Sequence, residues 1–166
     1  MRATSADART QAERLIRSGT FGSTLARNEG VVLPAITVED PDGEAHSWFV
    51  PVAAGQSLLG FFELGLDLTP LRYSSLQRQD DTGDGCPEVR VWCDPAAVAQ
   101  RAAAAVSGGT AVGEPRLSYD RTPARLAWRV RVRAGDGREH TVMVAGDAAW
   151  EAPPADEGSF GARPER

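Results

Sequence analysis

The segment that most constrains the fold is residues 127–135, "AWRVRVRAG", in which apolar and charged side chains alternate. Successive side chains of a β-strand point to opposite faces of a sheet, so this segment predicts a strand with one apolar face and one face of arginines. A turn sequence, "GDG" at 135–137, follows, and then a second alternating segment, "EHTVMVAG" at 139–146. Together these segments predict a β-hairpin.

The register of this hairpin follows from the requirement that both strands present their apolar side chains to the same face. A three-residue turn at 135–137 satisfies that requirement. It also places an arginine opposite a glutamate on the two strands beside the turn. The predicted facing pairs are Val130 with Val142, Trp128 with Val144, and Arg133 with Glu139.

Two segments predict α-helices. The first covers about residues 5–17 and carries a partial apolar stripe. Thr4 with Asp7 three residues later resembles a capping box, and Gly19 supplies a stop.

The second predicted helix covers about residues 95–106 and is rich in alanine. Asp94 can accept hydrogen bonds from the free amides of the first turn, Pro95 sits where no amide is needed, and Gly108 can adopt a left-handed cap. We expect the apolar face of the strand at 127–135 to lie under this helix.

An earlier segment, "SWFVPVAAG" at 47–55, has the same Trp-x-Val-x-Val spacing as the segment at 127–135. Its outward positions carry Phe49 and Pro51 in place of arginines, so we expect its outer face to be covered as well. Each predicted helix is followed by a strand led by proline, then by a Trp strand and then by a third strand. The proline-led strands are expected at 34–40 and 115–120, and the third strands at 57–66 and 139–146.

The sequence therefore predicts an α+β protein in which an α-β-β-β unit occurs twice, with two antiparallel sheets that could join into one continuous sheet. Chance also supplies shared residues in a chain rich in Ala, Val and Gly, so the matching order of elements is what favours a duplication. Residues 21–30 predict a loop or a further short helix. The predicted boundaries are 1–76 for the first unit, 77–93 for a linker or exposed loop, 94–152 for the second unit and 153–166 for a disordered tail.

A helix followed by three antiparallel strands, with an aromatic-x-Val-x-Val strand and a glycine-containing hairpin, resembles PepSY-like modules and, more loosely, cystatin-like modules. The resemblance covers most of residues 5–75 and 94–151. It implies a noncatalytic role, such as a protease propeptide or an inhibitory or binding domain of the cell envelope. The residues that carry it are Trp128, Val130, Val132, Gly135, Asp136, Gly137, Val142 and Val144, with a fainter match at Trp48, Val50, Val52 and Gly55.

The composition restricts the partners and the compartment. A net charge of -5 argues against general nucleic-acid binding, which needs excess cationic charge. No apolar stretch approaches the length of a membrane span, and the N-terminal segment lacks the apolar run of a secretory signal, so we expect a cytoplasmic protein. Cys86 and Cys93 would remain free thiols there, whereas an oxidising compartment would allow them to close a small disulfide loop.

The candidate binding residues are Arg129, Arg131 and Arg133, which share the outer face of the predicted strand at 127–135. Such a ladder could hold an acidic protein or peptide, or a partner that bears phosphate. The alternative interpretation is a solvated face that discourages aggregation between sheets.

No segment forms a diagnostic catalytic or metal-binding motif, and the sequence predicts no catalytic residue, metal ligand or cofactor. "DDTGDG" at 80–85 begins like a calcium loop, but Val91 occupies the position that should hold a glutamate. His46 and His140 have no companion ligand at metal-binding spacing. The serines at 74–75 lie outside any Gly-x-Ser-x-Gly sequence, although a triad assembled in space stays open.

Two functions of different class are consistent with these observations. The leading hypothesis is a noncatalytic binding or inhibitory module that acts through a protein or peptide surface. The alternative is a small-molecule-binding protein or enzyme with a pocket between a curved sheet and a helix. A deep cavity lined by polar groups such as His46, Tyr73 or His140 would favour the alternative.

Overall fold

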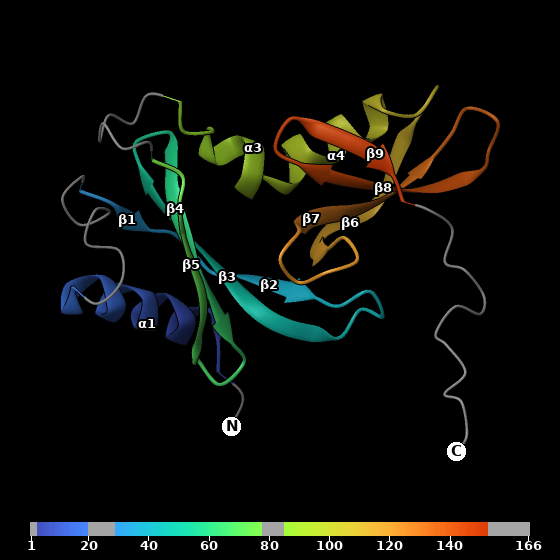
Figure 1. The fold of residues 1–166 in the computed structure, drawn as a ribbon. Helices are drawn as coiled ribbons and strands as arrows, with labels where there is room; N and C mark the ends of the chain where they lie inside the picture. The colour runs from blue at the N-terminus through green and yellow to red at the C-terminus, as the bar shows by residue number, and fades with distance from the viewer. Residues whose placement is uncertain (1–2, 20–28, 78–84, 153–166) are drawn as a thin grey trace, which may run out of the picture.

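The computed structural model describes residues 3–19, 29–77 and 85–152, which form helices packed on a large sheet (Figure 1). The described helices are α1 (Ser5–Ser18), α3 (Val89–Cys93) and α4 (Pro95–Ala104). The described strands are β1 (Val31–Val32), β2 (Ile36–Glu39), β3 (Ala45–Ala54), β4 (Ser57–Gly65), β5 (Pro70–Ser75), β6 (Thr110–Tyr119), β7 (Leu126–Arg133), β8 (Glu139–Ala145) and β9 (Ala148–Glu151).

All of the described strands belong to one nine-stranded sheet, in the order β5-β4-β3-β2-β6-β7-β8-β9 with β1 paired to β3. Strands β2 to β5 form one antiparallel meander and strands β6 to β9 form another. The two meanders meet at β2 and β6, which run parallel with Val38 opposite Leu117. The fold is therefore α+β, and its sheet continues from the N-terminal half (residues 3–77) into the C-terminal half (residues 85–152).

The helices α1 and α4 cover opposite faces of this sheet. Val38 and Leu117 face each other across the parallel pair, so they point to the same side, and both lie in the core beneath α4. In β3, Phe49 points to this side as well, whereas the next residue, Val50, lies in the core beneath α1. Figure 1 shows α1 beside the N-terminal strands and α4 beside the C-terminal strands.

The ends of α1 are fixed by the local groups that the sequence predicts. The Asp7 amide donates to the Thr4 hydroxyl at 3.3 Å, and the Thr4 amide donates to the Asp7 carboxylate at 2.8 Å, which together form a capping box. Gly19 closes the helix in the left-handed conformation with φ 71°. The small side chains of Ala8 and Ala12 are fully buried, so the helix approaches β3 closely.

The predicted hairpin register of the C-terminal half is confirmed. Val130 faces Val142, Trp128 faces Val144, and Arg133 faces Glu139. Asp94 accepts a hydrogen bond from the Ala96 amide and begins α4, as expected. The side chains on the Trp128 face of β7 form one hydrophobic core with side chains of α4. The strand contributes Trp128, Val130 and Val132, and the helix contributes Val98 and Ala102.

The outer face of the first Trp strand is covered, as its sequence predicts. Phe49 is 2% exposed and Pro51 is buried. The cover on this side comes from the C-terminal half, because α1 occupies the other face. Trp48, Val50 and Val52 all belong to the α1 core, in which Trp48 is half-buried.

The structure also departs from the predicted order of elements. Each half carries a fourth meander strand, β5 or β9, beyond the three strands expected, and β1 is an additional short strand. Part of the segment expected as a linker or exposed loop forms α3, and Leu58 of β4 donates its amide to the Pro87 carbonyl at 2.8 Å. Among the described residues, no helix has both the length and the apolar character needed to cross a membrane.

Several sequence predictions fall outside the described residues. They are the loop or short helix at 21–30 except its last two residues, the calcium-like positions Asp80, Thr82 and Asp84, and the tail at 153–166.

Candidate functional site

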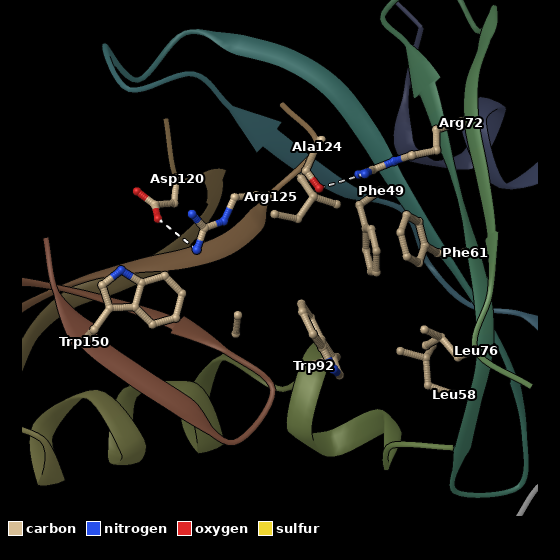
Figure 2. Close-up of a pocket in the computed structure, with 12 residues that line it drawn as sticks. Phe49, Leu58, Phe61, Arg72, Leu76, Trp92, Asp120, Ala124, Arg125 and Trp150 are labelled. Atoms are coloured by element: carbon tan, nitrogen blue, oxygen red, sulfur yellow. Dashed lines mark hydrogen bonds and ion pairs between the residues drawn. The ribbon is translucent and has the colours of Figure 1, made fainter. Parts of the chain in front are cut away.

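A pocket of about 300 Å³ lies between the two halves (Figure 2). One wall is the face of β3 and β4 that α1 leaves free. The opposite side is formed by α3, by the turn between β6 and β7, and by the C-terminal strands β8 and β9. The lining residues are Phe49, Leu58, Phe61, Arg72, Leu76, Trp92, Asp120, Ala124, Arg125, Leu126, Ala145 and Trp150.

The pocket is mainly apolar and aromatic. Phe49 and Phe61 pack at a ring-centroid distance of 4.8 Å and form one wall. Figure 2 shows Trp92 rising from α3 between this pair and the side occupied by Trp150. The backbone of Trp92 is held in place, because the indole Nε1 of Trp128 donates a hydrogen bond to its carbonyl oxygen at 2.8 Å. The rings therefore stand on elements that are fixed to the core.

A buried ion pair borders the phenylalanine wall. Glu63 is 4% exposed, and its carboxylate lies 2.9 Å from the guanidinium of Arg72. The hydroxyl of Ser47 donates a second contact to this carboxylate at 2.8 Å. Arg72 also donates to the Ala124 carbonyl at 2.9 Å, which links β5 to the turn before β7. This arrangement compensates the buried carboxylate and connects the two halves beside the pocket.

The turn between β6 and β7 supplies one partly buried carboxylate and an exposed arginine to the pocket. Asp120 lies 3.6 Å from the guanidinium of Arg125 and 4.0 Å from that of Arg121. Two arginines thus share one carboxylate. The side chain of Arg125 is 64% exposed, and Figure 2 shows it at the pocket near Trp150.

The predicted binding residues Arg129, Arg131 and Arg133 lie together on the face of β7 opposite Trp128, which we call the arginine face. Arg131 and Arg133 are exposed, and Arg129 is half-buried. Arg129 donates to the Pro41 carbonyl at 2.6 Å, and Arg133 pairs with Glu139 at 3.0 Å. Within the described residues, Arg131 forms no ion pair.

A fourth arginine joins this face from the neighbouring strand. Arg116 of β6 stands directly opposite Arg129, so the two side chains point to the same side. Arg116 also lies 3.5 Å from Glu39 and 3.7 Å from Glu114. Like charges directly opposite each other destabilise a sheet. The ion pairs of Arg116 with Glu39 and Glu114 offset part of the repulsion between Arg116 and Arg129.

The cross-strand register brings the arginine face next to the pocket. Arg129 faces Met143, and Met143 faces Trp150, so these three side chains form a row on one side of the sheet. Trp150 also lines the pocket. The arginine face and the pocket between the halves are therefore adjacent at Trp150.

The polar groups expected of a small-molecule pocket lie elsewhere. Tyr73 stacks on Phe62 at 5.2 Å on the α1 side of the sheet. His140 lies 2.7 Å from Glu151 and lines a second hollow, of about 530 Å³, at the C-terminal end of α4. His46 packs edge-on against Tyr119 at 5.5 Å. None of the three lines the pocket between the halves.

One trio of residues has the composition of a catalytic triad but not its geometry. His46 Nδ1 lies 3.1 Å from the hydroxyl of Ser47, which donates to Glu63 at 2.8 Å. A nucleophilic serine would donate to the histidine and be accessible to substrate. Ser47 instead donates to the acid and is 0% exposed, so the trio has a structural role.

The remaining reactive groups are two free thiols, Cys86 and Cys93. Burial raises the pKa of the Cys93 thiol to about 12 and raises the pKa of Cys86 to a smaller extent. Reactive cysteines have a lowered pKa, so neither thiol is an activated nucleophile. Within the described part of the chain, no three His, Cys, Asp or Glu side chains gather to hold a metal ion.

No family model, curated protein or solved structure matches this chain. The resemblance to PepSY-like and cystatin-like modules consequently stays a prediction.

Sequence reasoning identified the arginine face but not the pocket. The pocket residues come from separate segments, and most of them are apolar residues that a sequence assigns to the core. One available signal was the tryptophan of "EVRVWC" at 88–93, which the sequence places in a linker or exposed loop. A large aromatic residue in such a segment indicates a packed contact.

Proposed function

We propose that the protein is a noncatalytic binding module that holds an acidic segment of a partner protein or peptide on the arginine face. The observation that carries the proposal is the alignment of Arg116, Arg129, Arg131 and Arg133 on one side of β6 and β7 in a chain of net charge -5. An anionic partner would relieve the repulsion between Arg116 and Arg129 and would supply an ion-pair partner for Arg131.

The geometry of the face suits an extended peptide. Side chains on one side of a strand repeat every second residue, so Arg129, Arg131 and Arg133 offer guanidinium groups at a regular spacing along β7. Carboxylates pair with guanidinium groups in a bidentate manner, which gives direction as well as attraction.

We also infer that the two halves are copies of one helix-on-sheet unit related to PepSY-like or cystatin-like modules. Both halves have a helix followed by an antiparallel meander, and the first meander strands, β2 and β6, pair with each other. Trp48 belongs to the core beneath α1, and Trp128 belongs to the core beneath α4. Equivalent strands thus present equivalent residues to their own helix.

The binding proposal is tested by titrating a fluorescein-labelled poly-glutamate peptide with the full chain and measuring fluorescence anisotropy. We expect binding that weakens as salt is added, because exposed charges are screened. The variant Arg129→Ser/Arg131→Thr/Arg133→Ser should lose at least about tenfold in affinity. A matched control, Arg9→Gln/Arg14→Gln/Arg17→Gln, removes three arginines from α1 and should bind as the wild type does.

Two results would overturn the proposal. One is equal loss of affinity in both triple variants, which would indicate an effect of net charge alone. The other is unchanged binding by the β7 triple variant. A poly-lysine peptide serves as the control for general electrostatic attraction, and its binding should not weaken in the β7 triple variant.

A further inference from the structure

We propose that the pocket between the halves is a second binding site, which takes a small carboxylic acid whose body is one aromatic ring or a short branched apolar group. This site goes beyond the binding of an acidic partner and does not depend on it. The proposal rests on the shape and lining of the pocket and on the charges of one turn.

The volume of the pocket sets the size of the ligand. It measures about 300 Å³. Small-molecule sites begin at about this volume, and an engineered apolar cavity of about 150 Å³ binds benzene. The pocket therefore has room for one ring with a short arm.

The aromatic residues that line the pocket favour a ligand whose main part is apolar or aromatic. Phe49 and Phe61 form one side, and the rings of Trp92 and Trp150 stand across from them. A flat aromatic ring can stack or pack edge-on against such walls, which adds to the gain from burying its surface. A polar body would lose its hydration against these ring faces.

The charged side chains that line the pocket determine which polar group the ligand should carry. Arg72 lies 2.9 Å from Glu63, donates to the Ala124 carbonyl and packs over the Phe61 ring at 5.3 Å, so it shapes the wall, and its buried Nε makes no hydrogen bond with any described residue. Arg125 is free to turn to a ligand, because its ion pair with Asp120 spans 3.6 Å and its side chain is 64% exposed. Asp120 keeps Arg121 as a second partner at 4.0 Å when Arg125 turns away. A carboxylate at the mouth would pair with Arg125 and neutralise the net positive charge of Asp120, Arg121 and Arg125, whereas an amine would add to that charge.

The test compares phenylacetate with two isosteres of different charge, phenylacetamide and 2-phenylethylamine. Each is titrated into the full chain, and binding is followed by tryptophan fluorescence and by ligand-observed NMR. We expect phenylacetate to bind about two- to fivefold more tightly than phenylacetamide, the effect of an exposed ion pair, and 2-phenylethylamine to bind most weakly.

Two variants and one control locate the site. Arg125→Gln should lower the affinity for phenylacetate to that for phenylacetamide and leave the affinity for phenylacetamide unchanged. Ala145→Phe should fill the pocket and remove binding of both. Arg138→Gln is the matched control, because Arg138 is exposed at the β7–β8 turn and also pairs with a carboxylate at 3.6 Å, that of Asp136. It should bind phenylacetate as the wild type does.

Equal affinity for the three compounds, or no binding of any of them at millimolar concentration, would overturn the proposal. Unchanged binding in Arg125→Gln would also overturn it. Should Ala145→Phe fail to fold, as judged by its melting curve, the comparison of Arg125→Gln with Arg138→Gln still decides the question. The variant Arg129→Ser/Arg131→Thr/Arg133→Ser should bind phenylacetate normally, so failure of one site is distinguishable from failure of the other.

Discussion

The indole Nε1 of Trp128 donates a hydrogen bond to the backbone carbonyl of Trp92 across 2.8 Å. Trp128 belongs to the core beneath α4, and Trp92 lines the pocket between the halves. The contact therefore ties the short helix α3 to strand β7 of the C-terminal meander. The position of the pocket's aromatic wall depends on a residue whose own ring is 3% exposed.

Replacing Trp128 with Phe should test this contact. The variant keeps an aromatic ring in the core but removes the donor to the Trp92 carbonyl, so we expect a loss of about 1 to 3 kcal/mol in the free energy of unfolding. Urea denaturation measures the loss. Trp150→Phe changes the same kind of ring at a half-buried position and should cost less; a larger cost there would argue against the role of the Trp128 contact.

The junction between α4 and β6 depends on a glycine for space rather than for a left-handed backbone. A Cβ at Gly109 would lie 2.4 Å from the Ala103 carbonyl oxygen and 2.9 Å from that of Val106. Gly109→Ala should therefore force the end of α4 away from the sheet and lower the melting temperature by several degrees, on the order of 1 to 3 kcal/mol.

The matched control for that substitution is Gly135→Ala. Its Cβ would meet its nearest neighbour at 3.6 Å, an ordinary contact. We expect its melting temperature to stay within about 2 °C of the wild type. Equal melting temperatures for both variants would contradict the packing of α4 described above.

The buried ion pair of Glu63 and Arg72 predicts a strongly non-additive double-mutant cycle. Arg72→Met should leave the Glu63 carboxylate buried with only the Ser47 hydroxyl as a close partner, and should cost about 2 to 4 kcal/mol, since Arg72 is partly exposed. Adding Glu63→Gln should restore part of the loss. Urea unfolding of both single variants and the double variant gives the interaction free energy of Glu63 and Arg72. Strictly additive losses would show that the two residues contribute independently.

The thiols predict a reactivity order and a pH dependence. Cys93 should react more slowly than Cys86 with a thiol reagent at pH 8, because its pKa is raised to about 12 and only the thiolate reacts. The single-cysteine variants Cys86→Ala and Cys93→Ala separate the two rates. Faster reaction at Cys93 would contradict its burial.

The sign of the pH effect follows from the raised pKa. The folded chain keeps the Cys93 proton, while the unfolded chain loses it near the ordinary value of 9.0. Stability contributed by the neutral thiol is complete below pH 9 and decreases as the pH rises from 9 towards 12, by at most about 1.4 kcal/mol per pH unit. The melting-temperature difference between wild type and Cys93→Ala should decrease over that range.

Local sequence signals predicted the elements whose ends or faces are marked by single residues. The Thr4–Asp7 pair and Asp94 began their helices as expected, and alternation along β7 and β8 determined which residues face each other. These features depend on neighbours close in the chain, so the sequence carries them directly.

Elements that depend on distant partners were not predictable in this way. The β5 sequence "PLRYSS" lacks a regular apolar alternation, and its partner β4 supplies its order. The four residues of β9 and the five of α3 are too short to give a periodic signal. The parallel pairing of β2 with β6 joins residues that are far apart in the chain, which is why the pocket between the halves could not be foreseen.

The central claim is that β7 has two faces with separate roles, in which Trp128, Val130 and Val132 hold the core and Arg129, Arg131 and Arg133 form a binding surface. The most direct test is equilibrium urea unfolding of Trp128→Ala beside the variant Arg129→Ser/Arg131→Thr/Arg133→Ser. We predict a loss of about 3 to 5 kcal/mol for Trp128→Ala, from the cavity left in the core, and a loss of less than about 1 kcal/mol per arginine in the triple variant. A triple variant that fails to fold while Trp128→Ala is tolerated would show that the two faces have been assigned the wrong way round.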